Sequence, residues 1–345
     1  MIDIGREEEL ISYLRKINFI STGNPVQISE FGGGVSCKVI QVKTNGNSFV
    51  IKQALSKLKV KDSWYSDRSR IINERKCLEV YQEIIPDFVP GILYHDDANY
   101  LFIMESISPN AIPWKNILLK GNIDYDVGRK ISFALAKVHE HSSGDSKIKN
   151  IFNSDKFFIE LRIEPYLETI KQKHPALNNL ISQAIYLLLT DKTVLVHGDY
   201  SPKNILVLHK NIFILDFEVA HWGNPIFDLA FLTNHLLLKS IKNPRLIDEY
   251  LGLMIEMVNV YFENRGSVNR AIVEKDTINL LALLFLARVD GKSPAEYIEA
   301  ESDKKAVREL SYSMLLEDNY EKYEQLPDLF KKYLLKFKKV EELDK

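Results

Sequence analysis

The pattern of apolar side chains changes near Ser106, and this change constrains the fold more than any other feature. Residues 26–54 alternate apolar and polar side chains around Asn45-Gly46, a dipeptide that favours a tight hairpin. Residues 126–141, 157–172 and 175–189 instead repeat apolar side chains at helical spacing. We therefore predict an α+β chain with an N-terminal part at 1–105 and a larger, mainly helical part at 106–345.

Further elements are expected in the N-terminal part. An amphipathic helix is predicted over residues 7–18, and a second over 67–83, where Ile71 and Leu78 repeat at helical spacing. Two short apolar runs, 91–95 and 100–104, read as strands separated by a turn. The prediction is an antiparallel sheet accompanied by helices.

The helical part is interrupted once, between Thr193 and Asp216. Two short β-rich runs, 194–196 and 212–215, enclose a polar loop there. This is the segment in which we look for chemistry.

Composition excludes several classes of protein. The 345 residues are 46% hydrophobic and 27% charged, typical of a globular protein, and 45 basic against 47 acidic residues leave a net charge of −2. This balance predicts no nucleic-acid partner and no attraction to a membrane surface. The first ten residues lack the apolar run of a leader, and no run approaches the ~20 apolar residues of a membrane span, so a cytoplasmic protein is expected.

The two cysteines, Cys37 and Cys77, are too few for a disulfide framework. Neither lies in a metal-ligand spacing such as CxxC. Both are expected to be reduced structural thiols.

The polar loop carries the residues that phosphoryl transfer requires. Asp199 is followed five positions later by Asn204, and Asp216 stands at the end of the next apolar run. Such a set can supply one carboxylate to orient an attacking hydroxyl and two oxygen ligands for Mg²⁺, a hard cation. The plain alternative is that these are ordinary loop residues bounding strands.

The segments 197–204 (HGDYSPKN) and 214–218 (ILDFE) resemble the HGDxxxxN and hydrophobic-Asp-x-Glu elements of the aminoglycoside phosphotransferase and choline kinase superfamily. The resemblance implies a protein-kinase-like fold of two lobes and a small-molecule kinase that transfers the γ-phosphoryl group of ATP or GTP to a hydroxyl. It further implies that Asp199 is the catalytic base, that Asn204 and Asp216 are Mg²⁺ ligands, and that His197 is structural.

The N-terminal part supplies candidates for nucleotide binding. A glycine cluster with Gly32, Gly33, Gly34 and Ser36 lies between two alternating segments, where backbone amides can approach phosphate oxygens closely. Taken alone, such a cluster is as well explained by a plain hairpin turn.

Lys52 ends the apolar run 49–52, and Glu74 lies on the following predicted helix. An ion pair between them would aim the lysine at the α- and β-phosphates. Without the downstream loop, Lys52 could equally be a solvated edge-strand lysine.

The segment 103–107 resembles the hinge of this superfamily. Backbone groups of Glu105 and Ile107 would then bond the purine edge, although a simple strand end is the alternative. Asp228, in the segment 224–230, resembles the residue that caps a helix and braces the catalytic loop. HGD replaces the HRD of protein kinases, Asp216-Phe217-Glu218 replaces DFG and no APE element is present, which favours a small-molecule acceptor.

The acceptor is not specified by these residues. Glu218, His221 and Trp222 follow the metal-binding aspartate and are expected to face the phosphoryl group or the acceptor, although Trp222 could be a core anchor. The polar loop 288–294 could reach the acceptor or simply end a helix. An aminoglycoside or amino alcohol would favour carboxylates and aromatic faces, and a sugar such as methylthioribose neutral hydrogen bonds. Both chemistries, the choice of ATP or GTP, and the oligomeric state stay open.

A second hypothesis is a catalytically silent nucleotide-binding regulator with the same fold. Retention of Asp199, Asn204, Asp216 and Lys52 together argues against it, because a silent protein has no chemical need for the base.

Overall fold

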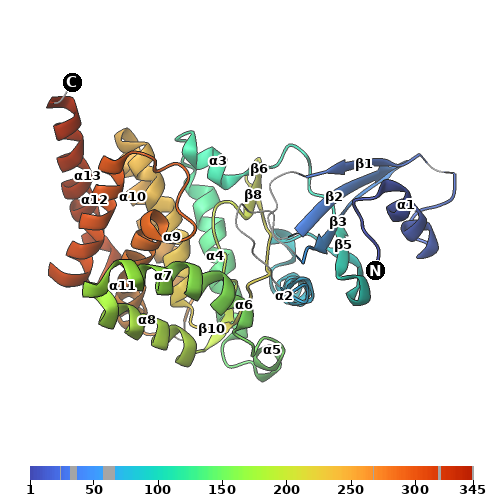
Figure 1. Ribbon diagram of the computed structural model, residues 1–345, viewed down its shortest axis with the longest axis horizontal. Coiled ribbons are helices and arrows are strands. Elements are labelled where there is room, and N and C mark those ends of the chain that lie inside the picture. Colours follow the sequence, from blue (N-terminus) through green and yellow to red (C-terminus); the bar gives the residue numbers. More distant parts are fainter. Residues whose placement is uncertain (24, 32–36, 57–66, 267, 318–319, 344–345) are drawn as a thin grey trace. The chain divides into compact units, whose positions relative to one another are not determined.

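The computed structural model describes residues 1–345 except 24, 32–36, 57–66, 267, 318–319 and 344–345 (Figure 1). The chain divides into two compact units. Residues 1–111 together with 216–218 form the sheet unit, and residues 112–215 with 219–345 form the helical unit. The predicted α+β class, with an antiparallel sheet followed by a helical part, is confirmed.

The sheet unit is built on five antiparallel strands in the order β1-β2-β3-β5-β4. Their bounds are β1 Gln27–Glu30, β2 Cys37–Thr44, β3 Asn47–Ala54, β4 Ile92–Asp96 and β5 Leu101–Glu105. The predicted hairpin is present, because β2 and β3 pair from Cys37↔Ala54 to Thr44↔Asn47. Gly46 closes it at φ +90°, a backbone conformation that glycine adopts without steric cost.

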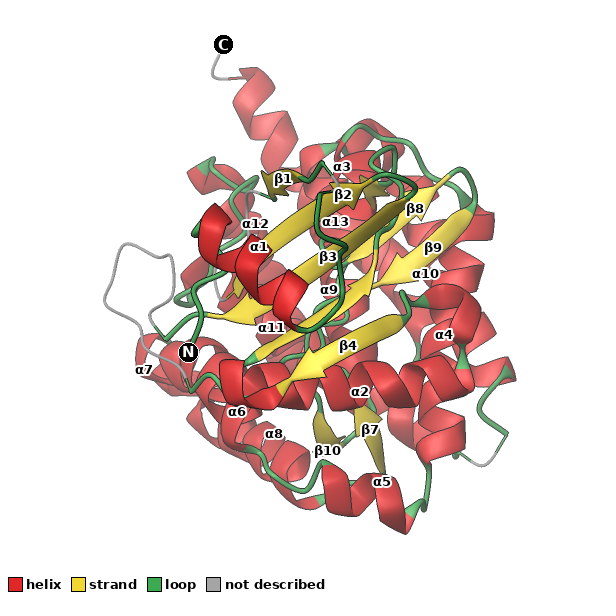
Figure 2. Cartoon of the chain, turned by 90° about the vertical axis from the view of Figure 1, so that its right-hand side faces the viewer, coloured by secondary structure: helices red, strands yellow, loops and turns green. Residues whose placement is uncertain are grey.

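Helix α1 (Glu7–Lys16) covers one face of this sheet, as Figure 2 shows. Its buried side chains Leu10 and Leu14 pack in one core cluster with Ile40, Ile51 and Ile103 from the strands. Because successive strand side chains point to opposite faces, Lys52 lies on the other face, where it meets α2 (Arg70–Ile84). The predicted helices at 7–18 and 67–83 are thus confirmed with slightly different ends.

The helical unit is organised around α9 (Ile226–Lys242), which packs against α10 and α11. Every residue from Ile226 to Ile241 is buried, as expected for a helix enclosed by other elements. The other helices are α3 Trp114–Leu119, α4 Tyr125–Ser142, α5 Ser146–Ile151, α8 Asn178–Thr190, α10 Ile247–Glu263, α11 Arg270–Asp290, α12 Glu301–Tyr312 and α13 Leu326–Leu343.

One helical stretch of this unit departs from α-helical geometry. It runs through α6 (Lys156–Phe158), a π-helical segment at Ile159–Glu168 and α7 (Thr169–Lys173). Pro165 lies inside it and has no N–H to donate, so the regular backbone ladder cannot continue through this position. The predicted helix at 157–172 is therefore present, with a π-helical centre that apolar periodicity did not reveal.

Short strands frame the polar loop. β7 (Val194–Val196) pairs with β10 (His221–Gly223), and β9 (Asn211–Ile214) pairs with β8 (Ile205–Leu208), which also pairs with β6 (Ile112–Pro113). The two predicted runs are strands, but each pairs with a strand that the sequence analysis missed. The remaining short helical turns are Pro86–Phe88, Asp97–Asn99, Pro175–Leu177, Pro244–Leu246, Ser313–Glu317 and Tyr323–Gln325.

Two further expectations concern single features. Cys37 and Cys77 are both buried. No helix in the described part of the chain is long and apolar enough to cross a membrane.

Candidate active site

The loop between β7 and β8 holds Asp199 and Asn204 together in the helical unit. The Asn204 Nδ2 donates to the Asp199 backbone carbonyl at 3.0 Å and to its Oδ2 at 2.8 Å. Asp199 is 4% exposed, with Arg162 Nη2 at 2.9 Å from its Oδ1 and Lys203 Nζ at 3.0 Å from its Oδ2. The loop thus fixes one carboxylate among three nitrogen donors.

A glycine allows this loop to turn. Gly198 has φ +76°, and a Cβ at this position would lie 2.7 Å from the carbonyl oxygen of Val219. Any other residue would have a strained backbone here, because residues with a Cβ rarely adopt a positive φ. Its Cβ would also clash with the Val219 carbonyl oxygen.

Asp228, in the first turn of α9, binds the backbone of the loop. It accepts from the backbone amides of His197 at 2.7 Å and Gly198 at 2.9 Å, and its Oδ2 lies 3.2 Å from His139 Nε2. Burial raises the pKa of Asp228, but the hydrogen bond and charge of His139 outweigh burial and lower it below its ordinary value. The bracing role that the resemblance implied is therefore present in these contacts.

The sheet unit holds a second group of predicted residues. Lys52 Nζ lies 2.6 Å from Glu74 Oε1 and 2.7 Å from Asp216 Oδ1, so the predicted Lys52–Glu74 ion pair is formed and Asp216 joins it. Burial lowers the pKa of Lys52, but Asp216 and Glu74 outweigh burial and raise the pKa well above its ordinary value. The lysine is therefore held as a cation.

Asp216 itself has an uncommon backbone. Its φ is +71°, in the left-handed region that few residues other than glycine adopt. Such conformations cost free energy and concentrate at functional sites.

The segment 216–218 is anchored to α2 by two contacts. Arg70 Nε lies 3.1 Å from Glu218 Oε2, and Asn73 Nδ2 donates to the Glu218 carbonyl at 3.3 Å. Arg70 is fully buried, and no motif marked it in the sequence. The Glu218 carboxylate, expected to face the phosphoryl group, is engaged by this arginine.

The remaining residues predicted to bind the nucleotide are Gly32, Gly33, Gly34, Ser36, Glu105 and Ile107. Gly32, Gly33, Gly34 and Ser36 lie outside the described residues. Glu105 ends β5 with an exposed side chain whose Oε2 accepts from the Gly91 amide, and its own amide donates to the Gly91 carbonyl at 2.8 Å. Ile107 is half-buried just beyond the strand.

The structure corrects two expectations about the acceptor site. His221 is 1% exposed and stacks on Phe158 with ring centroids 4.0 Å apart. Trp222 is buried and donates from Nε1 to the Lys192 carbonyl at 3.1 Å. Both belong to the core because β10 pairs with β7. The prediction that His221 faces the phosphoryl group or the acceptor is therefore wrong, whereas for Trp222 the alternative of a core anchor is confirmed.

The donor set is compatible with Mg²⁺. Within the described ranges, no group of three His, Cys, Asp or Glu side chains could hold a metal by itself. Asn204 and Asp216 would each offer an oxygen, and Mg²⁺ in phosphoryl-transfer sites typically takes one or two protein ligands and completes its shell with phosphates and water. Asn204 in the helical unit and Asp216 in the sheet unit each carry an oxygen of the kind that Mg²⁺ takes.

Comparison with known proteins supports the interpretation of this chain as a phosphotransferase. The model of the phosphotransferase enzyme family (APH) matches residues 128–252, which include Asp199, Asn204, Asp216 and Asp228. Methylthioribose kinase of Bacillus cereus (strain G9842) is 24% identical over 279 residues, covering 73% of this chain and 70% of that protein.

Solved structures show the same fold. A choline kinase from Cryptosporidium parvum Iowa II superposes with a TM-score of 0.54 at 15% identity, covering 98% of this chain and 97% of its own. A choline/ethanolamine kinase family protein from Mesorhizobium loti gives a TM-score of 0.50 at 15% identity. The match covers 94% of this chain and 99% of that protein's chain.

These findings confirm the class predicted from the sequence. The chain is a small-molecule kinase, a phosphotransferase with a hydroxyl acceptor, and residues 128–252 are similar to the phosphotransferase enzyme family. Nothing in these comparisons favours the silent regulator.

Proposed function

We propose that this kinase transfers the γ-phosphoryl group of ATP, or of GTP, to a hydroxyl of a small sugar-like metabolite in the cytoplasm. The observation that carries the proposal is the buried Asp199 carboxylate, which Asn204 holds at 2.8 Å on a loop braced by Asp228. A carboxylate fixed in this way can orient an attacking hydroxyl and accept its proton.

The remaining predicted residues divide by task. Lys52, kept in place by Glu74, would bind the α- and β-phosphates. Asn204 and Asp216 would hold Mg²⁺, which neutralises charge on the polyphosphate. The backbone of Glu105 and Ile107 would bond the purine, and the glycine cluster at 32–34 with Ser36 would cover the phosphates.

This assignment gives each part of the chain a role. Residues 1–105 would bind the nucleotide, and 106–345 would supply the catalytic loop and the acceptor site. A sugar-like acceptor is supported by the curated relatives, which are named methylthioribose kinases. The helical unit carries the family match, so the acceptor residues are sought there.

Mg²⁺-dependent nucleotide consumption tests the proposal. ATP and GTP would each be supplied with aminoglycosides, choline, ethanolamine, methylthioribose, homoserine and simple sugars. Acceptor-stimulated turnover that disappears without Mg²⁺ and in Asp199→Ala is expected. Tight nucleotide binding without turnover on any of these acceptors would contradict the proposal and favour a regulator.

A further inference from the structure

The loop between β7 and β8 is bound by a buried arginine that no sequence motif marked. Arg162 is 9% exposed and lies in the π-helical segment Ile159–Glu168. Its Nε donates to the Gly198 carbonyl at 2.7 Å, and its Nη2 lies 2.9 Å from Asp199 Oδ1. One guanidinium group therefore contacts both the backbone of the loop and the carboxylate of the candidate base.

The backbone groups of Gly198 are bound by two different elements. Its amide donates to Asp228 of α9 at 2.9 Å, and its carbonyl accepts from Arg162. Glycine can adopt many backbone conformations, so its own sterics do not define the course of the chain here. The bonds from Asp228 and Arg162 define it instead, and with it the direction in which the next residue, Asp199, leaves the loop.

Contacts on both carboxylate oxygens define the orientation of Asp199. Arg162 Nη2 lies on Oδ1, and Asn204 Nδ2 donates to Oδ2 at 2.8 Å. The terminal torsion of an aspartate has a broad range, which a second contact narrows. Because hydrogen bonds between charged groups are roughly twice as strong as neutral ones, the arginine contact should restrict this torsion strongly.

The guanidinium group of Arg162 is supported by two aromatic rings. Its carbon lies 5.9 Å from the centre of the Tyr166 ring and 5.5 Å from the centre of the Phe231 ring of α9. Arginine stacks favourably on aromatic faces, and its planar donors lose little freedom when they bind. The Tyr166 hydroxyl in turn accepts from Arg288 Nη1 of α11 at 3.2 Å. Side chains from α9 and α11 thus support the arginine on the loop.

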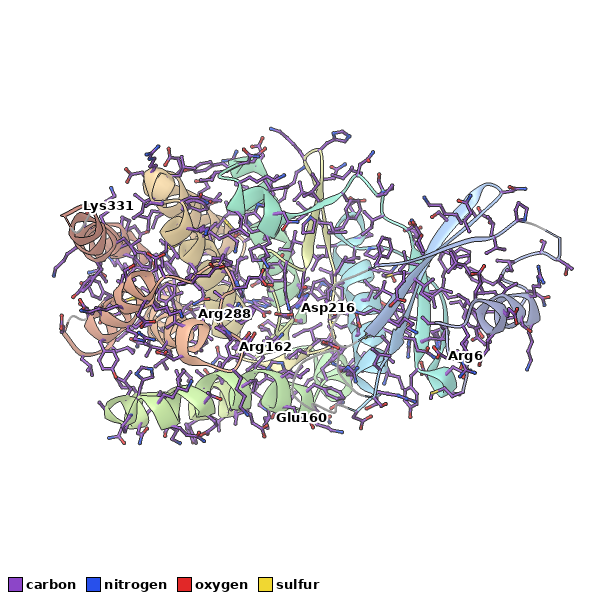
Figure 3. All side chains as sticks on the ribbon, turned by 45° about the horizontal axis from the view of Figure 1, so that its top comes forward. Arg6, Glu160, Arg162, Asp216, Arg288 and Lys331 are labelled. Atoms are coloured by element: carbon purple, nitrogen blue, oxygen red, sulfur yellow. The ribbon has the colours of Figure 1, made fainter. Side chains whose placement is uncertain are left out.

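The segment that carries Arg162 has an uncommon backbone. π-helical turns are rare and frequently occur at functional sites, and this one spans ten residues. In Figure 3, where both residues are labelled, Glu160 lies at the outer edge of the segment and Arg162 on its inner side. An uncommon backbone at the residue that contacts the candidate base indicates a functional constraint on that residue.

Resting on the function proposed above, we propose that Arg162 is a positioning residue for phosphoryl transfer. It fixes Gly198 and Asp199 so that the carboxylate meets the acceptor hydroxyl in the orientation needed for attack on the γ-phosphoryl group. Small displacements of a reacting group can reduce a rate by roughly 100-fold. Because Arg162 acts through Asp199, its loss should lower kcat and leave nucleotide affinity unchanged.

Kinetics of Arg162→Gln test this role. Turnover of Mg²⁺-ATP would be measured with methylthioribose as the acceptor and with water alone, and nucleotide affinity by calorimetry. In Arg162→Gln, kcat should fall at least roughly ten-fold and nucleotide affinity should stay within about two-fold. Arg162→Lys, which keeps the charge without the paired donors, should have an intermediate kcat. An unchanged kcat in Arg162→Gln, or a nucleotide affinity that falls as much as kcat, overturns the inference.

The matched control is Arg308→Gln. Arg308 of α12 binds Asp290 through two donors at 2.9 Å each, so this variant also breaks an arginine–carboxylate pair of the helical unit. It should lower the melting temperature and leave kcat unchanged. An equal fall of kcat in Arg308→Gln and Arg162→Gln would show that destabilisation, and not positioning, causes the effect. If thermal melts show that Arg162→Gln is unfolded, Arg162→Lys carries the test, and an unaltered kcat in that variant refutes the role.

Hydrogen exchange provides a readout that needs no acceptor. Mass spectrometry of the full chain should show faster amide exchange of the segment 197–204 in Arg162→Gln than in the unaltered chain or Arg308→Gln, because the loop loses two contacts. Equal exchange in all three would contradict the positioning role.

A double variant separates this role from the proposed function. Arg162→Gln combined with Asp199→Asn should have the kcat of Asp199→Asn alone, because no carboxylate is left to position. If Asp199→Asn loses turnover while Arg162→Gln keeps it, only the positioning role of Arg162 fails. If Asp199→Asn keeps most of its turnover, the proposed function fails as well.

Discussion

Single residues of this protein bear local costs that a phosphotransferase site explains. Asp216 occupies the left-handed region, and Lys52 is buried between two carboxylates. Both features are unfavourable on their own and persist where the surrounding contacts define them.

Removing the Lys52 charge tests its role at this scale. Lys52→Met should raise KM for the nucleotide and lower kcat/KM by roughly 10- to 100-fold, because charge-assisted hydrogen bonds to phosphate contribute on the order of 1.5–3 kcal/mol each. Steady-state kinetics with varied nucleotide would measure it.

The matched control is Lys210→Met, an exposed lysine in the turn between β8 and β9 that pairs with Asp126. It should leave KM for the nucleotide unchanged. Equal KM in Lys52→Met and the unaltered chain would contradict the phosphate-binding role.

The buried His221 predicts how stability depends on pH. Burial lowers its pKa from 6.5 to about 4, so the folded chain holds the ring neutral where the unfolded chain protonates it. The stabilising contribution is present above pH 6.5 and is lost as pH falls through about 4, amounting to about 3 kcal/mol.

Denaturant titrations between pH 7 and 4 would measure this contribution. The free energy of unfolding should fall less steeply in His221→Gln than in the unaltered chain, whereas His141→Gln, at an exposed position of α4, should follow the unaltered chain. Parallel slopes for all three would refute the assignment.

Sequence motifs identified some residues of the site but not those that tertiary packing brings to it. Lys52, Asp199 and Asp216 lie in short sequence segments that can be recognised by themselves, so the sequence alone was enough to predict them. Arg162 lies four residues before Tyr166 on the same helical segment, whereas Arg288 comes from α11 and only tertiary packing brings it to this ring. Sequence spacing contains no signal for the approach of Arg288.

At the scale of elements, the catalytic loop depends on its glycine. Gly198→Ala should destabilise the protein by more than the ~1–2 kcal/mol of the left-handed backbone alone, because the new Cβ meets the Val219 carbonyl at 2.7 Å. Turnover should fall as well, since Asp199 is the next residue.

Gly144→Ala is the matched comparison. Gly144 has φ +73° in the same unit, and a Cβ there meets nothing within 4 Å. Denaturant titrations should show a smaller loss of stability for this variant, with turnover retained. An equal loss of stability in both variants would show that the clash has no effect.

Elements were predictable where the sequence carries a clear apolar repeat or run. Helices α1, α2 and α4 and the β2–β3 hairpin have enough repeats for periodicity to define them. β10 (His221–Gly223) lacks the apolar run that marked the equally short β7, and β8 was missed although it is as long as β9. Missing β10 also caused the wrong placement of His221, since strand pairing with β7 buries it.

At the scale of the whole molecule, the division near Ser106 is a prediction from the change of pattern in the sequence. The sheet unit ends at residue 111 and also includes residues 216–218, which lie far along the chain. Sequence order alone could not assign that segment to the sheet unit. The Arg70–Glu218 pair, within the sheet unit, gives the physical reason.

The central claim is that Asp199 serves the chemical step and not nucleotide binding. Turnover and Mg²⁺-nucleotide affinity would be measured together for the unaltered chain and Asp199→Asn, which preserves size while removing the base. The account predicts a loss of kcat of at least roughly 100-fold, the scale of general-base catalysis, with nucleotide affinity within about two-fold. Retention of most of the turnover in Asp199→Asn would contradict it.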